Sequence, residues 1–268
     1  MKQLYPHWDE AHALEWRRSF GPPARPTNSE CLVYKRELAK FPRGTKAMLL
    51  GSTPEIRDIA AEYGLDLTVV DESEKNYYEL QGLMMHAGGH ETFVKGDWTG
   101  MNFISEFDVA IGDSVLSVLS TEDAKKVMEK VHRALTPGGE WITRVMLYES
   151  GEDFISPDTL NGRIRNCGTK KDIYEQLFVP FLTYYKIEVG AVKGSSTYER
   201  LKRDVDKGLF PEACLEVFNV LRRYPEENFL VERSEFEAYI GKTFSIEKAI
   251  DYTEPFSRNW IIYVLKKK

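Results

Sequence analysis

The sequence has little of several features that would mark a particular class of protein. Its three cysteines, Cys31, Cys167 and Cys214, are far apart and odd in number, so they fit neither a disulfide framework nor a zinc-ligand spacing. No apolar run approaches the ~18 residues of a membrane-spanning helix, and the polar, acidic N-terminus does not resemble a secretion signal. We expect a soluble cytoplasmic protein without a membrane partner.

An excess of positive charge is also missing. The chain has 36 lysines and arginines against 42 aspartates and glutamates, for a formal net charge of -6, which disfavours nucleic acid as the main partner. Internal repeats and low-complexity tracts are absent from the sequence as well. With 268 residues and 42% hydrophobic content, the chain can bury a sizeable core, either as one α/β domain with an insertion or as two small domains.

Apolar runs and amphipathic helices alternate through the first half of the chain. Strands are expected at 46–51, 67–71, 91–97, 107–113 and 140–147, and helices at 54–64, 73–86 and 120–135. The segment TPGG at 136–139 is expected to turn the chain into the fifth strand. Such alternation predicts a parallel sheet covered by helices on both faces.

The alternation stops after about residue 149. Helical patterns follow at 170–185 and 211–225, and two strands at 244–252 and 259–268 are expected to form an antiparallel hairpin at the sheet edge. The predicted fold is α/β: a Rossmann-like, mostly parallel sheet with an antiparallel last strand, plus a mainly helical insertion. The predicted domains are an N-terminal helical cap segment (1–45), the sheet domain (46–148 and 244–268) and a helical insertion or lid for substrate (149–243).

The first strand ends in a turn with a single glycine, LLGSTPE. Pro54 removes one backbone N–H, so the turn lacks donors that would hold a pyrophosphate. Thr53 is expected to cap the following helix, with Pro54 at its first position, and Ser52 with Glu55 could form a capping box. The turn therefore favours a ligand without phosphates, such as S-adenosylmethionine, over a dinucleotide.

Three carboxylates close predicted strands, where an open parallel sheet binds its ligands. Asp71, Asp97 and Asp113 end the second, third and fourth strands. Asp71 lies 20 residues after Gly51, a spacing that suits the two hydroxyls of a ribose. The alternative for Asp71 is a helix N-cap, a position that aspartate also favours.

Taken together, these residues resemble a class I S-adenosylmethionine-dependent methyltransferase over roughly 46–147 and 244–266. A subset of that family with a G-x-T-P-E turn and a preceding G-P-P-x-R-P segment is closer still, and Gly51–Glu55 and Gly21–Pro26 match the two motifs. The closing pair of strands also resembles the reversed last strand pair of that family. The resemblance implies S-adenosylmethionine as the cofactor.

The resemblance also implies which residues contact that cofactor. The turn would contact its methionine part, Asp71 its ribose hydroxyls, and Asp97 with Trp98 its adenine, although Trp98 could equally be a core residue. Asp113 and Ser114 lie where the family lines the cofactor and the reacting methyl group. The predicted cofactor-binding residues are Gly51, Ser52, Thr53, Asp71, Glu72, Asp97, Trp98, Asp113 and Ser114.

Two other functions remain open at this point. A single-glycine turn could belong to a catalytically inactive, methyltransferase-like binding or regulatory protein. The run GDSVLS (112–117) resembles the GDSL hydrolase signature, but the last histidine is His132, so the C-terminal histidine base of those enzymes is missing.

Methyl transfer is an in-line displacement that depends mainly on alignment of the two reactants. The sequence shows no carboxylate–histidine pattern for a general base and no carboxylate cluster for a metal, so the catalytic residues stay open and no metal is expected. The aromatic-rich insertion suits a small or medium organic acceptor, with most of its aromatic residues expected in the core of the lid. The acceptor, the attacking atom and the oligomeric state stay open.

Overall fold

The computed structural model describes residues 25–86, 89–149, 156–189, 194–223, 229–251 and 259–268. Its centre is an eight-stranded sheet in the order β3-β2-β1-β4-β5-β8-β7, with β6 beside the end of β5. The strands are β1 (Lys46–Leu50), β2 (Asp66–Asp71), β3 (Glu91–Lys95), β4 (Phe107–Asp113), β5 (Leu135–Tyr148), β6 (Val231–Glu232), β7 (Phe244–Ile250) and β8 (Trp260–Lys267). Strands β1 to β5 are parallel, and β8 is antiparallel to both β5 and β7. The predicted mostly parallel sheet with an antiparallel last pair is confirmed.

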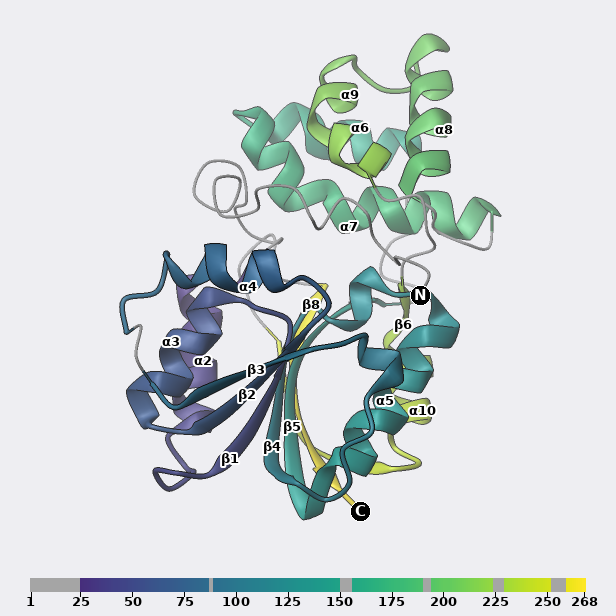
Figure 1. Cartoon of the computed structure of the whole chain (residues 1–268). Helices are drawn as coiled ribbons and strands as arrows, with labels where there is room; N and C mark the ends of the chain where they lie inside the picture. The colour runs from purple at the N-terminus through teal and green to yellow at the C-terminus, as the bar shows by residue number, and fades with distance from the viewer. Residues whose placement is uncertain (1–24, 87–88, 150–155, 190–193, 224–228, 252–258) are drawn as a thin grey trace.

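Helices cover both faces of this sheet because its inner strands are apolar on both sides (Figure 1). Ala47 and Leu49 of β1 pack in one core with α2 (Asn28–Leu38), α3 (Pro54–Tyr63) and α4 (Glu74–Gln81). Met48 and Leu50 point to the opposite face, in a second core with α5 (Thr121–Ala134) and α10 (Arg233–Ile240). The apolar side chains spaced along α5 are buried: Ala124, Val127, Met128 and Val131, with Leu135 buried at the start of β5.

A separate group of helices lies above the carboxyl ends of the parallel strands (Figure 1). It comprises α6 (Pro157–Asn166), α7 (Lys170–Val189), α8 (Gly194–Asp206), α9 (Ala213–Val217) and the 3₁₀ helix η4 (Phe218–Arg223). Aromatic residues of the insertion lie in or against its core, as expected: Tyr174, Phe178, Phe181, Tyr184, Tyr185 and Tyr198. Phe154, also in the insertion, lies outside the described residues.

Several boundaries differ from the prediction, and the following differences are the most informative. The helix expected at 73–86 ends at Gln81, because the N–H groups of Met85 and His86 donate to the Asp58 carboxylate instead of continuing the helix. Strand β5 begins at Leu135 rather than Glu140, and the intervening TPGG forms an irregularity in its pairing with β4. The helix expected at 211–225 is a short α-helix followed by the 3₁₀ helix η4.

A short strand and a helix also occur where the sequence showed no such alternation. Val231 and Glu232 form β6, which pairs with β5, and Phe236 and Ile240 of α10 pack in the core of the sheet. The end of the segment assigned to the insertion therefore covers the sheet. The division into three domains stays a prediction. None of the described helices combines the length and apolar character needed to cross a bilayer.

Candidate functional site

The ends of three neighbouring strands form the centre of the candidate site. Leu50 of β1 pairs with Val70 of β2 on one side and with Gly112 of β4 on the other. The next residue of each strand lies at the same edge, so Gly51 stands between Asp71 and Asp113. Because β1 has β2 on one side and β4 on the other, this edge is the topological switch point of the sheet, where such folds bind ligands.

The turn after β1 requires its glycine. Gly51 has φ +87°, a left-handed conformation that other residues adopt only with strain, and its N–H donates to the Val70 carbonyl at 2.9 Å. Thr53 is at the N-cap position of α3 with Pro54 in the first turn, as predicted, but the Thr53 side chain makes no capping hydrogen bond. The capping box between Ser52 and Glu55 is wrong, because each side chain has another partner. Ser52 Oγ donates to Asp71 Oδ2 at 2.6 Å, and Glu55 Oε1 accepts from Arg25 Nη1 at 3.3 Å.

Asp71 is held at this edge by two donors from different segments. Besides Ser52, the backbone N–H of Ser73 donates to Asp71 Oδ1 at 2.9 Å. The N-cap alternative for Asp71 is wrong, since Ser73 caps α4 with its own hydroxyl, which accepts from the N–H of Asn76. Asp71 is half-buried, and each oxygen of a carboxylate can accept more than one hydrogen bond. Glu72, next to it, is half-buried too.

The third strand contributes Asp97 and Trp98. Asp97 is exposed and caps the 3₁₀ helix η2 (Trp98–Gly100), accepting from the N–H and the hydroxyl of Thr99 at 2.8 and 2.7 Å. The indole N–H of Trp98 donates to the Val70 carbonyl at 2.7 Å, and its ring lies 3.6 Å from where a Cβ on Gly51 would stand. Trp98 therefore packs against both the core and the turn.

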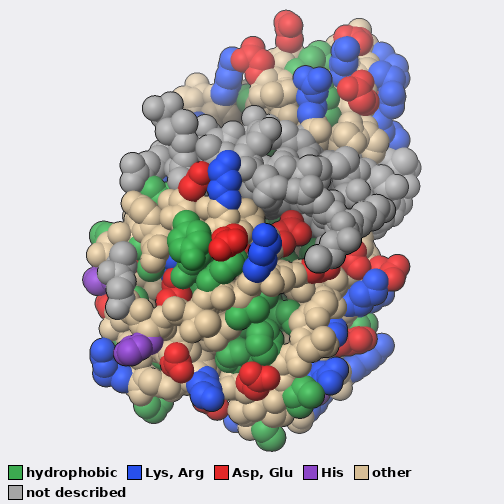
Figure 2. Space-filling model, in the orientation of Figure 1, with side chains coloured by type: hydrophobic (Ala, Val, Ile, Leu, Met, Phe, Trp, Pro, Cys, Tyr) green, Lys and Arg blue, Asp and Glu red, His purple; other side chains and the backbone are tan. Residues whose placement is uncertain are grey.

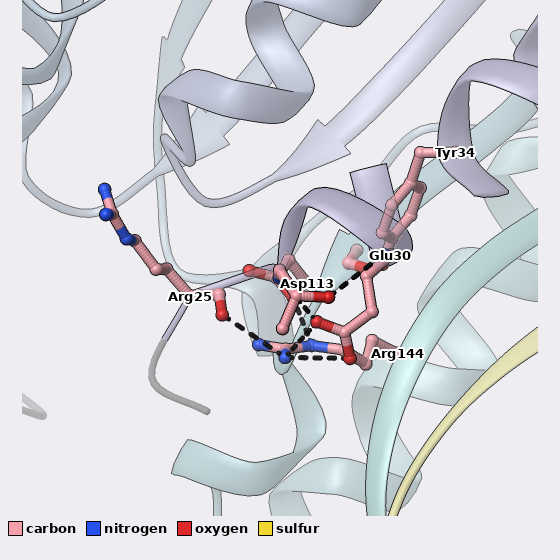
Figure 3. A network of polar contacts seen from close by, with 7 residues as sticks. Arg25, Glu30, Tyr34, Asp113 and Arg144 are labelled. Atoms are coloured by element: carbon pink, nitrogen blue, oxygen red, sulfur yellow. Dashed lines mark hydrogen bonds and ion pairs between the residues drawn. The ribbon is translucent and has the colours of Figure 1, made fainter. Parts of the chain in front are cut away.

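The fourth strand places Asp113 in a buried ion pair (Figure 3). Its side chain is 2% exposed, and its Oδ1 accepts from Arg144 Nε at 2.7 Å. Burial raises the pKa of Asp113 to about 6, against the lowering effect of Arg144 and with a further increase from Glu30 and Glu55. Asp113 thus lies at the expected edge, with one of its oxygens directed to Arg144.

Sequence reasoning missed Arg144 and Glu30. Arg144 lies in β5, and its Nη1 donates to both carboxylate oxygens of Glu30 on α2, at 3.1 and 3.2 Å. Its guanidinium also lies 4.6 Å from the ring centre of Trp260. The available signal was an arginine inside the otherwise apolar run WITRVML, since a buried charge requires a partner. Glu30 belongs to a T-x-x-E capping-box pattern (27–30) that the structure forms, but this pattern gave no indication of the ion pair with Arg144.

Ser114, directly after Asp113, has a strained backbone. Its φ is +61°, and its N–H donates to the Arg144 carbonyl at 3.1 Å. Such conformations cost about 1–3 kcal/mol in non-glycine residues and concentrate at functional sites. Its Oγ is buried and has no partner among the described residues, so no described histidine activates it as a hydrolase nucleophile would require. Within the described part of the chain, no group of three or more potential ligands could hold a metal ion.

The predicted residues thus fall into two groups on either side of Gly51. Ser52, Asp71 and Trp98 are joined to the turn by contacts that the structure shows. Asp113 and Ser114 flank it on β4 and are joined to β5 and α2. Thr53 is buried at the start of α3, and Asp97 lies at the exposed end of β3.

Comparison with known proteins agrees with this geometry. Residues 50–139, from the end of β1 to the start of β5, match a family described as a methyltransferase domain. No curated protein sequence matches the chain.

Solved structures show the same fold at low sequence identity. A Rhodobacter sphaeroides protein, provisionally described as a zinc-dependent alcohol dehydrogenase, matches with a TM-score of 0.61 and 18% identity over 96% of this chain and 98% of its own. The magnesium protoporphyrin IX methyltransferase of Synechocystis, solved with S-adenosylhomocysteine, matches at 0.56 and 14% over 98% and 97%. The Burkholderia thailandensis 1,6-didemethyltoxoflavin-N1-methyltransferase, solved with its acceptor and S-adenosylhomocysteine, matches at 0.54 and 11% over 98% and 81%.

The matched segment contains the turn at Gly51 and the strand ends at Asp71, Asp97 and Asp113. The mostly parallel sheet with an antiparallel last pair is the fold expected from the resemblance to class I methyltransferases. Residues 50–139 therefore form part of a methyltransferase domain, in a sheet whose fold is shared with solved S-adenosylmethionine-dependent methyltransferases.

Proposed function

We propose that the protein transfers a methyl group from S-adenosylmethionine to a small-molecule acceptor, and that the edge around Gly51 binds the cofactor. The observation that carries this proposal is the fixed carboxylate of Asp71. The Ser52 hydroxyl and the Ser73 N–H hold it next to the Gly51 turn, where it can accept hydrogen bonds from both hydroxyls of a ribose.

The rest of the edge fits the same cofactor. The Gly51 turn leads into a helix whose first residue, Pro54, has no N–H to offer a phosphate. Trp98 presents an aromatic ring beside the turn, suited to contact with adenine. Ser114 has a buried hydroxyl that lacks a partner among the described residues, as expected of a group that faces a ligand.

When bound, S-adenosylmethionine supplies a methyl group already activated by its sulfonium. In the transfer, the carbon–sulfur bond breaks with its electron pair left on sulfur, and the acceptor atom forms the new bond to the methyl carbon and releases its proton to solvent or a base. The chain itself aligns the two reactants. Asp71 and the Gly51 turn hold the cofactor, and the strained backbone at Ser114 lies where the acceptor approaches the methyl group.

A small organic acceptor is supported by three observations. The methyltransferases of similar fold from Synechocystis and Burkholderia thailandensis are named for magnesium protoporphyrin IX and 1,6-didemethyltoxoflavin, both small organic molecules. Helices α6 to α9 lie above the carboxyl ends of the strands, in the position of a roof over the site (Figure 1). On the face that Figure 2 shows, basic and acidic side chains of the described residues are interspersed, which does not favour a nucleic-acid backbone.

Calorimetric titration tests the cofactor assignment. Wild type should bind S-adenosylmethionine and S-adenosylhomocysteine with micromolar affinity. Asp71→Ala should raise both dissociation constants by about 10- to 100-fold, the effect expected from the loss of hydrogen bonds to a charged group. Asp66→Ala, which removes an exposed carboxylate at the opposite end of the same strand, is the matched control and should bind like wild type. An absence of binding by wild type would contradict the proposal and favour the inactive, methyltransferase-like binding protein.

A further inference from the structure

Arg144 of β5 holds two consecutive residues of the β4 end (Gly112–Ser114). Its side-chain Nε donates to Asp113 Oδ1 at 2.7 Å, and its backbone carbonyl accepts from the N–H of Ser114 at 3.1 Å. The side chains of Arg144 and Asp113 are almost completely buried, at 1% and 2% exposed. Because a charge-assisted hydrogen bond of this kind is strong and directional, Arg144 fixes the β4 end from the neighbouring strand.

Helix α2 holds the same segment from one face of the sheet, through two residues one helical turn apart (Figure 3). The Tyr34 hydroxyl donates to the Gly112 carbonyl at 2.8 Å, and this bond is buried. Glu30 anchors Arg144, since its two carboxylate oxygens accept from Arg144 Nη1 at 3.2 and 3.1 Å. Helix α2 therefore supports the β4 end both directly and through Arg144.

The β4 end requires such support because its backbone is strained. Ser114 has φ +61°, and a residue with a side chain keeps this conformation only where the surrounding structure holds it. The hydrogen bond from Ser114 to the Arg144 carbonyl is one such contact, and the bond from Tyr34 fixes the peptide group of Gly112 just before it. Loss of either contact is therefore expected to let the β4 end move.

The β4 end and Asp71 lie on opposite sides of the Gly51 turn. Strand β1, which leads into the turn, has β2 with Asp71 on one side and β4 on the other. In the proposed function Asp71 binds the ribose, and Trp98, which follows β3 on the far side of β2, contacts the adenine. The remainder of an extended cofactor then continues across the turn toward β4. The part of the cofactor that reaches the β4 end is therefore its amino-acid part with the sulfur.

We propose that Tyr34 and Arg144 are positioning residues, which hold the β4 end in the conformation that binds the amino-acid part of S-adenosylmethionine. This inference rests on the proposed function. Each residue acts through the strand end that it holds and not by contact with the cofactor. Because a binding site loses affinity when the contacts that support it are loosened, a change at either residue should weaken only those ligands that carry the amino-acid part.

The test compares the dissociation constants of S-adenosylhomocysteine, which has the amino-acid part, and adenosine, which lacks it, by calorimetry. Tyr34→Phe removes one hydroxyl and should raise the constant for S-adenosylhomocysteine by about fivefold, the effect expected from the loss of one neutral hydrogen bond. The constant for adenosine should not change.

Tyr77→Phe is the matched control for Tyr34→Phe. It removes a buried tyrosine's hydrogen bond to Glu91, which lies at the start of β3 and so at the opposite edge of the sheet. Because that bond goes to a charged carboxylate, Tyr77→Phe should reduce stability more than Tyr34→Phe does, yet bind both ligands like wild type. The comparison separates a loss of stability from a change at the site.

A second pair of variants keeps the test decisive if Tyr34→Phe does not fold. Glu30→Gln removes the charge that anchors Arg144 and should repeat the selective loss of S-adenosylhomocysteine binding. Glu37→Gln should bind both ligands like wild type, since Glu37 is a fully buried carboxylate on the same helix that pairs with Arg36, Lys40 and Lys248.

The outcomes distinguish this inference from the proposed function. Equal weakening of both ligands by Tyr34→Phe and Glu30→Gln would overturn the inference, because a general loss of structure has that effect. So would unchanged binding in both variants, or the same selective loss in Tyr77→Phe. If wild type did not bind S-adenosylhomocysteine at all, the proposed function itself would be contradicted.

Discussion

Two arginines are completely enclosed in the α/β body, and their charges are balanced in different ways. Arg57 of α3 meets a single carboxylate, Glu91 at the start of β3, with its Nε and Nη2 donating at 3.0 and 2.6 Å. Its Nη1 donates to the carbonyl of Tyr77, whose hydroxyl donates to the same Glu91. Arg144 instead meets two carboxylates, Glu30 and Asp113.

The two positions in the fold explain the difference. The ion pair of Arg57 with Glu91 joins α3, α4 and β3 near the amino end of β3. One carboxylate bound by two guanidinium nitrogens compensates the buried charge of Arg57 there. The Arg144 pairs join α2, β4 and β5 at the carboxyl edge, beside the proposed cofactor turn. Burying two carboxylates around one guanidinium carries a larger desolvation cost than the one-to-one pair of Arg57.

The largest expected effect comes from removal of the two cations. Arg144→Met removes the cation that pairs with the buried carboxylates of Asp113 and Glu30, although Glu30 still accepts from the N–H of Thr27. It should lower the free energy of unfolding by about 4 kcal/mol. Arg57→Met should cost less, about 2 kcal/mol, because Glu91 is 12% exposed and keeps the hydroxyl of Tyr77. Urea unfolding of both variants at pH 7.5 measures the difference. A larger loss for Arg57→Met would contradict the expectation that Arg144 stabilises more buried negative charge than Arg57 does.

A smaller effect, distinguished by its pH dependence, is expected for Asp113→Asn. The pKa of Asp113 is raised from 3.8 to about 6 in the folded protein, so the folded state binds a proton more readily than the unfolded state between these pH values. The stability that Asp113 provides is therefore full below about pH 4 and falls as pH rises to about 6. Relative to wild type, Asp113→Asn should gain on the order of 2 kcal/mol between pH 4 and pH 7.5.

Thermal unfolding at a series of pH values checks this prediction, with Glu37→Gln as the opposite case. Burial would raise the pKa of Glu37, but hydrogen bonds from Lys40, Lys248 and Arg36 hold it at about 2. The stability from Glu37 is therefore present above about pH 4.5 and lost as pH falls toward 2. If the difference in stability between Asp113→Asn and wild type did not change from pH 4 to 7.5, the pKa of Asp113 would not be raised in the folded protein.

The smallest expected effects separate the two tyrosines of these networks. Tyr77→Phe removes a 2.6 Å hydrogen bond to the Glu91 carboxylate and should cost about 2 kcal/mol, whereas Tyr34→Phe removes a 2.8 Å bond to the neutral carbonyl of Gly112 and should cost about 1 kcal/mol. Both substitutions preserve the ring and its packing, so urea midpoints report the hydroxyl contribution. Equal losses would mean that the charge on Glu91 adds nothing to its hydrogen bond.

Local patterns predicted the strands and the turn well because their causes are local. The run KAMLLG, the left-handed glycine that ends it and the helix started by Pro54 all depend on residues a few positions apart. The same reasoning failed for the partner of Ser52, because its hydroxyl bonds Asp71, which is 19 positions away, rather than a neighbouring helix N–H. It also failed for TPGG, whose place in β5 depends on pairing with β4.

The sequence by itself determined the order of strands and helices, the single-glycine turn and the carboxylates at the strand ends, since hydrophobic period and backbone preference act within a few residues. The tertiary structure alone decided what those carboxylates meet. Arg144 and Glu30 are 114 positions apart and share no pattern, and they are brought together only when β5 enters the sheet and α2 packs on its face. A buried charge must be compensated wherever the fold places it, and the choice of its partners belongs to packing.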